Sequence, residues 1–316
     1  MRLGKYRHWW RYGNIVFLPA VLTVFTLTSI FYAYLLYRMV HPPIPAELVP
    51  SYHGLPFSEV RWKNRSGLSM KGWFIPGARG APVVILCHGY ESNRSEVLDL
   101  AATLQEKGAY NVLVFNLRGH DQSQPSRTSL GLYEKEDVLS TIDFVLSMSD
   151  VEKRIGLWGV SVGGHAALAA AVADERVTAV AVDSVYPNVR SFVGLQTRHL
   201  LRSQNRFLTG LMDVYYSAHF LILPSRLSER IPLERLQNTS LLFITGTNSP
   251  DLAALTRGLY AEAHAPKDIL PLVKSRDNSG YEVLFGDEKR LYDERVLEFF
   301  RKAMPVSGHG QARQKV

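Results

Sequence analysis

Cysteine is nearly absent from this chain of 316 residues. Cys87 is the only cysteine, so no intramolecular disulfide can form, and cysteine usage leaves the redox compartment open. No internal repeat or low-complexity tract is present, which argues against solenoid and fibrous architectures. The composition is ordinary for a globular protein, and the length suits one large domain with additions or two small domains.

Signals for metals and common cofactors are also missing. The ten histidines are scattered and show no metal-ligand spacing. The glycine-rich stretch 159–164 has neither the lysine of a phosphate-binding loop nor the spacing of a dinucleotide-binding turn. We therefore expect neither a metal nor a cofactor.

Acidic residues are absent from both ends of the chain, and this absence explains the net charge of +7. Residues 1–38 carry +5 and residues 302–316 carry +3, which leaves the body between them at −1. Binding to nucleic acid requires a basic patch on the folded body. None is indicated, and nucleic acid is not expected as a partner.

Charged residues are also missing from Tyr12 to Tyr37, and residues 15–37 are mostly apolar or aromatic. About 20 such residues cross a bilayer as a helix. The run is too long for the apolar core of a signal peptide, and no convincing cleavage site follows it. We expect a transmembrane anchor over 15–38; a buried core helix and a cleaved signal are the alternatives.

The flanks of this run indicate its orientation. Residues 1–14 hold four of the five nearby basic residues, which places the N-terminus in the cytoplasm by the positive-inside rule. The lipid bilayer is then a partner through this helix, and the body lies on the extracytoplasmic side of the cell membrane. Residues 39–54 form a linker, in which the proline-rich stretch 41–45 predicts a stiff spacer.

The body, residues 55–303, alternates between strand and helix patterns. A hairpin is expected first, and continuous apolar runs then predict strands that are buried on both faces. Such alternation favours a mostly parallel sheet with helices on both faces, an α/β class. The expected strands are 57–62, 68–75, 82–87, 111–115, 154–160, 177–182, 241–245 and 269–273; the expected helices are 96–107, 134–148, 163–173, 252–263 and 290–303.

The alternation stops between residues 186 and 235, where leucine, phenylalanine and tyrosine recur at helical spacing. This stretch predicts one or two helices that form a small cap over one end of the sheet. A longer crossover packed on the sheet has the same pattern and is the alternative. Residues 304–316 form a polar tail that we expect to be disordered.

The most informative stretch is Gly159-Val160-Ser161-Val162-Gly163, which follows an apolar run and precedes a small-residue helix pattern. This order is typical of a nucleophile elbow with Ser161 at its tip. Glycines on both sides relieve the crowding that the sharp turn creates. A glycine-rich strand-to-helix turn of another α/β protein has the same local pattern, so the surrounding motifs must decide.

Three further motifs supply that context: Gly72-Trp73-Phe74-Ile75-Pro76, Leu86-Cys87-His88-Gly89-Tyr90 and Asn116-Leu117-Arg118-Gly119-His120-Asp121-Gln122-Ser123. With the elbow they make the chain resemble the α/β-hydrolase family over about residues 55–303. Within that family it resembles the membrane-tethered bacterial members of the serine-aminopeptidase-like or esterase-like type. The resemblance implies an α/β-hydrolase fold with a small helical cap, preceded here by one transmembrane helix.

The resemblance also implies an oxyanion hole. The backbone N–H groups of Tyr90 and Val162 converge near the serine in such a fold. His88 is then structural, and Arg118-Gly119-His120 orders a loop beside the site.

The expected acid and histidine are missing from the family's usual places. Ser249 stands where the carboxylate is expected, and Asp251 follows two residues later as a weak acid candidate. Tyr281 stands where the histidine is expected, and no histidine occurs between His264 and His309. Tyrosine titrates near ~10 and cannot relay a proton as an imidazole does at neutral pH.

Other residues are candidates for the missing roles. His199 and His219 lie in the cap and are within possible reach of the site, whereas His165 is expected to pack against the sheet. Asp183 follows a strand from which some hydrolases draw their acid; without a histidine to orient, a structural role is favoured.

Two functions follow from these features. The first is a membrane-anchored serine hydrolase of esters, thioesters or amides, with Ser161 as nucleophile and an incomplete triad. The second is an inactive pseudohydrolase that binds a ligand or a protein. An apolar cap favours an apolar or acyl-bearing small molecule, and the sequence does not identify it.

Overall fold

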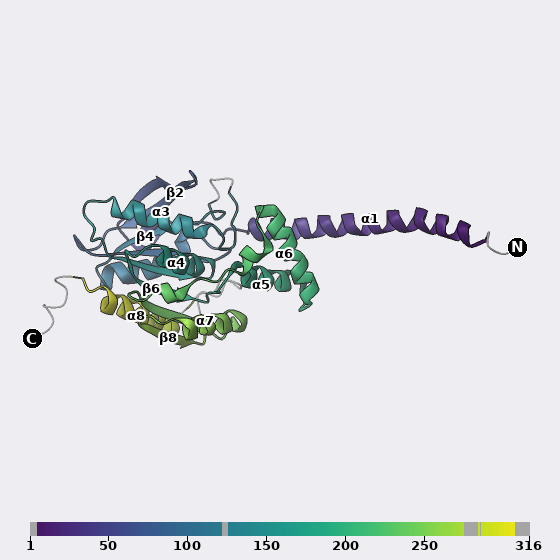
Figure 1. The fold of residues 1–316 in the computed structure, drawn as a ribbon. Coiled ribbons are helices and arrows are strands. Elements are labelled where there is room, and N and C mark those ends of the chain that lie inside the picture. The colour runs from purple at the N-terminus through teal and green to yellow at the C-terminus, as the bar shows by residue number, and fades with distance from the viewer. Residues whose placement is uncertain (1–4, 122–125, 275–283, 285, 307–316) are drawn as a thin grey trace, which may run out of the picture.

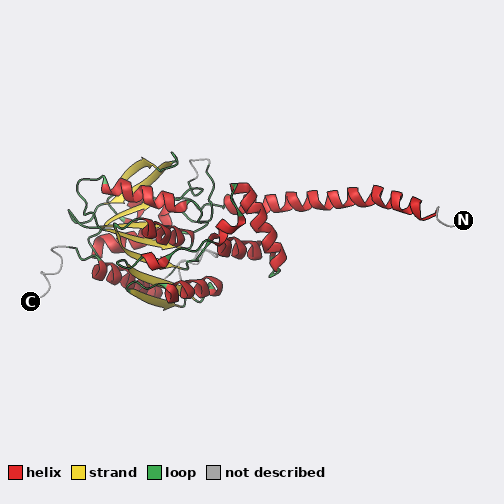
Figure 2. Ribbon diagram, viewed as in Figure 1, coloured by secondary structure: helices red, strands yellow, loops and turns green. Residues whose placement is uncertain are grey.

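The computed structural model describes residues 5–121, 126–274, 284 and 286–306, with side chains from Phe17 onward. An eight-stranded sheet with helices on both faces forms the body, and one long helix projects from it (Figures 1 and 2). The predicted α/β-hydrolase fold is confirmed. The predicted tail lies largely outside the described residues.

The sheet has the strand order β1-β2-β4-β3-β5-β6-β7-β8. The hairpin β1–β2 and the β2–β4 pair are antiparallel, and the other neighbours are parallel. The central strands are buried along their whole length, as their uninterrupted apolar sequences predict. The strands are β1 Ser58–Lys63, β2 Ser69–Ile75, β3 Val83–Cys87, β4 Asn111–Phe115, β5 Ile155–Val160, β6 Val177–Asp183, β7 Ser240–Gly246 and β8 Lys267–Leu272.

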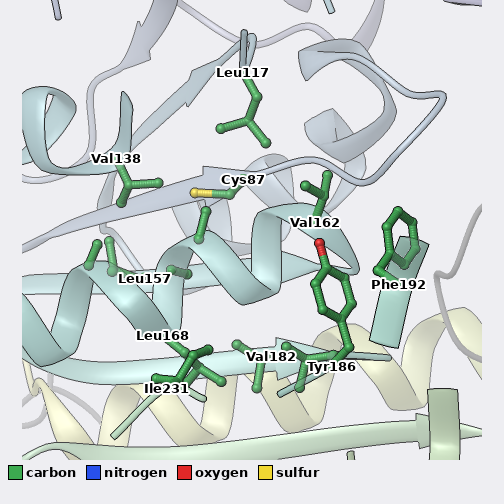
Figure 3. Close-up of a cluster of buried hydrophobic side chains, with 14 of the residues drawn as sticks. Cys87, Leu117, Val138, Leu157, Val162, Leu168, Val182, Tyr186, Phe192 and Ile231 are labelled. Carbon is green, nitrogen blue, oxygen red and sulfur yellow. The ribbon is translucent and has the colours of Figure 1, made fainter. Parts of the chain in front are cut away.

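Two hydrophobic layers cover the sheet. One face packs against α2 (Leu98–Ala102) and α8 (Gly286–Ala303). The other packs against α3 (Glu134–Leu146), α4 (Val162–Ala173) and α7 (Pro250–Glu262), and Figure 3 shows part of this second layer around α4.

The helical segment expected over 96–107 is confirmed, and it is divided among three kinds of helical turn. The side chain of Asn93 accepts the N–H of Ser95 and starts a tighter 3₁₀ turn, Arg94–Val97, ahead of α2. A π turn, Thr103–Lys107, then ends the segment. Local hydrogen bonding therefore divides a stretch that has an unbroken helical pattern.

Helices α5 (Val189–Leu201) and α6 (Arg206–Phe220) form a pair inserted between β6 and β7. Asparagine side chains cap both N-termini by accepting backbone N–H groups. Arg202 and Leu221 end the helices in the left-handed conformation. The pair lies on the side of the body from which α1 projects (Figure 1).

Helix α1 (Lys5–Val40) extends past the expected end of the anchor at residue 38. Its last turns are part of the hydrophobic core, where Leu36, Met39 and Val40 are buried. The hydroxyl of Tyr90 donates to the carbonyl of Met39 at 2.9 Å, and the N–H of Thr128 donates to the carbonyl of Val40 at 3.1 Å. The helix is thus built into the body.

The predicted linker contacts the body at Pro45 and Glu47, and a stiff linker off the membrane stays a prediction. Arg94 donates to both carboxylate oxygens of Glu47, at 2.8 and 2.9 Å, and its guanidinium stacks over Trp73. Asn93 donates to the carbonyl of Pro45 at 2.9 Å. These contacts supply the fixed position that the proline-rich sequence alone does not specify.

Candidate active site

Ser161 occupies the tip of the turn between β5 and α4. Its backbone has φ 52° and ψ −115°, a conformation that costs a non-glycine residue about 1–3 kcal/mol. A Cβ on Gly159 would lie 2.5 Å from the carbonyl oxygen of Gly163, and a Cβ on Gly163 would overlap the carbonyls of Cys87 and His88. Both flanking positions therefore require glycine, and the turn has the geometry of a nucleophile elbow.

The turn after β3 packs directly against this elbow. A Cβ on Gly89 would lie 3.8 Å from the Cβ of Ser161, so Tyr90 follows next to the serine. The N–H of Val162 opens α4, where the first turn leaves N–H groups without intrahelical partners. Neither this N–H nor that of Tyr90 donates to a backbone carbonyl among the described residues. An oxyanion hole requires such N–H groups, and their role here stays a prediction.

His88 holds the β3 turn in place. Its Nε2 accepts the N–H of Leu117 at 3.0 Å, so the ring proton is on Nδ1, which donates to the carbonyl of Gly89 at 2.8 Å. Burial lowers the pKa of His88 well below its ordinary value, so the ring is neutral at physiological pH. These contacts give His88 a positioning role in the turn.

The Arg118-Gly119-His120 segment is fixed in a similar way. Arg118 donates two side-chain hydrogen bonds to Asp137 of α3, at 2.9 and 2.7 Å, and Asn64 donates to the same carboxylate at 2.7 Å. His120 is fully buried, and burial lowers its pKa. The segment orders the loop beside the elbow and presents no side chain to the serine hydroxyl.

The hydroxyl of Ser161 has no hydrogen-bond partner within the described part of the chain, although the residue is only 2 % exposed. A buried hydroxyl without a partner costs about 1–3 kcal/mol. The strained backbone adds to this cost at the same residue. A strained backbone and a buried hydroxyl without a partner at one residue are typical of a functional position.

A cavity of about 670 Å³ lies at the elbow. Its wall combines the end of α1, the β3 turn, α5 and the start of α7. Ser161 and Tyr90 line it together with Ser249 and Asp251, whereas Val162 is buried behind the wall. The cavity therefore brings most of the predicted site residues together.

The segment at the expected acid position, Ser249 to Asp251, lies at the cavity. Ser249 follows β7 at the N-cap position of α7, where its side chain makes no capping hydrogen bond, and Asp251 lies exposed in the first turn of that helix. Tyr281, which stands at the expected histidine position, lies outside the described residues. No imidazole among the described residues bonds to the Ser161 hydroxyl.

Two other candidates, His165 and Asp183, have partners elsewhere in the structure. His165 stacks on Tyr186 and its Nδ1 lies 2.9 Å from that residue's carbonyl oxygen, so its ring is engaged behind the elbow. Asp183 accepts the hydroxyls of Ser184 at 2.9 Å and Tyr292 at 3.0 Å. These contacts give both residues structural roles.

His199 lines the cavity from α5, together with three charged residues that the sequence did not single out, Arg38, Glu91 and Arg198. Arg38 comes from the last turn of α1, and Glu91 follows Tyr90 with a positive φ of 56°. Burial raises the pKa of Glu91, and the positive charges of His199 and Arg38 oppose this rise. A carboxyl with a raised pKa in a cleft is a candidate for proton transfer. No sequence signal marks it, because the strained φ becomes visible only in the structure.

The fold, the elbow and the cavity together define an α/β-hydrolase scaffold. Residues 82–303 match the family model described as the alpha/beta hydrolase fold. The chain belongs to the α/β-hydrolase family.

Similar proteins agree with this assignment. The chain is 27 % identical over 285 residues to the uncharacterized protein YfhR of Salmonella typhi, covering 84 % of this chain and 85 % of that protein. It is 30 % identical over 124 residues to thiohydrolase aneE of Aspergillus aculeatus, covering 38 % of this chain and 39 % of that protein. The Pyrococcus furiosus esterase has the same fold, with a TM-score of 0.64, 20 % identity and coverage of 84 % of this chain and 98 % of that one.

Proposed function

We propose that this protein is a membrane-anchored serine hydrolase that cleaves an ester, thioester or amide of an acyl-bearing small molecule, with Ser161 as its nucleophile. The observation that carries the proposal is the serine hydroxyl, which is buried at the cavity without a described partner and held on a strained elbow. The names of the similar esterase and thiohydrolase support acyl chemistry as the reaction class.

In the proposed reaction, the Ser161 oxygen attacks the substrate carbonyl carbon, and the serine proton passes to a base. The carbonyl oxygen becomes an oxyanion, which the N–H groups of Tyr90 and Val162 stabilise. Collapse of this intermediate expels the protonated leaving group and leaves an acyl-serine. Water then attacks the acyl carbon, and the serine regains its proton as the acid is released.

The base must come from the titratable groups at the cavity, because serine is a weak nucleophile without one. Among the described residues that line it, Glu91, His199 and Asp251 are the candidates; the sequence indicated His199 as a substitute base and Asp251 as the acid. The variants Glu91→Gln, His199→Gln and Asp251→Asn distinguish them. Titration of the base produces one limb of the pH–rate profile. Only the variant that lacks the base should lose this limb.

The architecture of α1 supports an uncleaved anchor. Phe17–Val40 is apolar and long enough to cross a membrane, and most of its large apolar side chains are exposed up to Tyr37. Removing this helix would take Arg38 and Met39 from the cavity wall and the acceptor from the Tyr90 hydroxyl. The basic residues before the span support a cytoplasmic N-terminus and an extracytoplasmic body.

A second function is a pseudohydrolase that binds a ligand without turnover. Ser249 at the acid position favours this alternative, because a hydroxyl cannot orient or charge-stabilise an imidazole as a carboxylate does. In that case the cavity binds the same class of molecule and releases it unchanged.

A fluorophosphonate probe separates the two functions. The detergent-solubilised full chain is incubated with the probe beside Ser161→Ala, and the attached mass is located by peptide mapping. Labelling at Ser161 that the variant abolishes supports the hydrolase. A folded wild-type protein that remains unlabelled supports the pseudohydrolase.

A further inference from the structure

Helix α6 carries an apolar face that no described residue covers. Phe207, Val214 and Leu221 are 74 %, 55 % and 92 % exposed. Their spacing of seven residues places Phe207 and Val214 on one side of the helix, with Leu221 directly past its end, and Gly210 and Ala218 are exposed between them. We define this set as the α6 stripe. A contiguous exposed apolar surface on a helix marks a contact with a partner or a membrane.

The position of α6 along α1 indicates that the membrane covers the α6 stripe. The hydroxyl of Tyr215 donates to the hydroxyl of Ser29 at 2.7 Å, and the hydroxyl of Tyr32 donates to the carbonyl of Leu208 at 3.1 Å. The rings of Tyr32 and Tyr215 also stack, with centroids 5.3 Å apart. Helix α6 is therefore attached to α1 at residues 29–32.

Those residues lie at hydrocarbon depth when α1 spans the bilayer. A hydrocarbon core takes about 20 helical residues, and the uncharged stretch that can supply them runs from Tyr12 to Tyr37. Every window of that length within the stretch contains Ser29. In the window 12–31 Ser29 lies near the end of the core, and its contact with Tyr215 then places one side of α6 at the edge of the hydrocarbon core.

Charge supports the same placement. Arg202 and Arg206 are exposed at the turn between α5 and α6, directly before Phe207. Neither makes an ion pair among the described residues. Basic residues beside an exposed apolar face are typical of helices that lie in the surface of an anionic membrane.

We propose that α6 lies in the membrane surface beside α1, with the α6 stripe in the acyl-chain boundary and the arginines at anionic headgroups. This placement rests on the transmembrane anchor proposed above. Its consequence concerns substrate entry. With the core at residues 12–31, Arg38 lines the cavity about 10 Å further along α1, so the cavity opens on the headgroup side of the core and receives an acyl-bearing amphiphile from the bilayer.

The chain is suited to a depth measurement, because its only cysteine is buried and burial raises the pKa of its thiol. Spin labels are attached to Val214→Cys and Leu221→Cys in the full chain, reconstituted in vesicles of phosphatidylcholine and phosphatidylglycerol. Leu291→Cys is the matched control, since Leu291 is an exposed apolar residue of α8, on the part of the body away from α1 (Figure 1).

We expect collisions with oxygen, relative to those with a water-soluble nickel chelate, to be several-fold more frequent at positions 214 and 221 than at 291. Equal ratios at all three positions would place the α6 stripe in water and overturn the proposal. Shielding of 214 and 221 from both reagents would also overturn it, by showing a protein partner or a second copy on the stripe.

Hydrolysis supplies a separate test of the entry route. Val214→Glu with Leu221→Glu should lose most hydrolysis of a long-chain ester embedded in vesicles and retain that of a soluble short-chain ester, while Leu291→Glu retains both. Equal effects on the two substrates would refute entry from the bilayer. If the wild type cleaves neither ester, the proposed hydrolase function fails, and the spin labels still decide the position of α6.

Discussion

Replacing Ser161 should stabilise the protein while it removes the nucleophile. In Ser161→Ala the buried hydroxyl without a described partner disappears, which recovers about 1–3 kcal/mol of the free energy of unfolding. Ser161→Gly also relieves the backbone at φ 52° and ψ −115°, a further gain of about 1–3 kcal/mol. The greater flexibility of glycine in the unfolded chain takes back about 0.5–1 kcal/mol.

The assay is thermal unfolding of the purified full chain in one detergent, with fluorophosphonate labelling measured in parallel. A gain of 1 kcal/mol raises the Tm of a large domain by about 2 °C. We therefore expect the order of Tm values to be Ser161→Gly above Ser161→Ala above wild type, with labelling absent from both variants.

Ser129 provides the matched control. It is equally buried, but its hydroxyl donates to Glu134 at 2.6 Å and accepts the N–H of Tyr133 at 2.8 Å. Ser129→Ala should lower the Tm, because Glu134 and this N–H each lose a partner. If both serine-to-alanine variants lower the Tm by similar amounts, the hydroxyl of Ser161 is not a source of instability, and the elbow is not strained as we argue.

Three further predictions follow from the same contacts. Gly163→Ala should lower the Tm strongly and abolish probe labelling, because the added Cβ overlaps two backbone carbonyls; Ala166→Gly on the same helix is the control, and normal labelling of Gly163→Ala would contradict the elbow geometry. Arg94→Ala should cost about 1.5–3 kcal/mol, because Glu47 loses two charge-assisted hydrogen bonds and keeps the one from Asn116. Limited proteolysis should then cut within residues 41–54; resistance equal to the wild type would show that the pair does not hold this segment. Stability should fall as the pH drops below about 6.5, which is the pKa of histidine in the unfolded chain. Burial lowers the pKa of His88, His120 and His165 in the folded protein. The unfolded state therefore binds more protons than the folded state in this range. His120→Phe should flatten this fall in urea titrations at pH 7 and pH 5.5, and an unchanged slope would exclude a contribution from His120.

The elbow was predictable from sequence because its constraints are local. Gly159 and Gly163 are required by atoms within a few residues or on the adjacent strand end, so the turn leaves a signature in five consecutive positions. The buried strands were predictable for a similar reason, since burial on both faces demands an unbroken apolar run. The family assignment rests on these two features and on the order of the motifs.

The cavity wall was not predictable in the same way. The sequence pattern predicts that Arg38 flanks a membrane span and that Glu91 is an ordinary loop residue. Their places at the cavity depend on α1 docking into the body through Met39 and Val40, a contact between distant parts of the chain. Apolar residues at the end of a span have the same composition whether they contact lipid or protein, so no periodicity distinguishes the two.

The docking of α1 has a mechanical consequence under the proposed anchoring. A body on a loose tether swivels freely, whereas this body moves with its helix, because Tyr90 and Thr128 bond to the carbonyls of the last turn. A span longer than the hydrocarbon thickness tilts to fit it. Bilayer thickness therefore sets the inclination of the whole body, and with it the height at which the cavity meets the lipid. The lipid composition of the host membrane, through its thickness, thus determines how the cavity is positioned relative to its substrate.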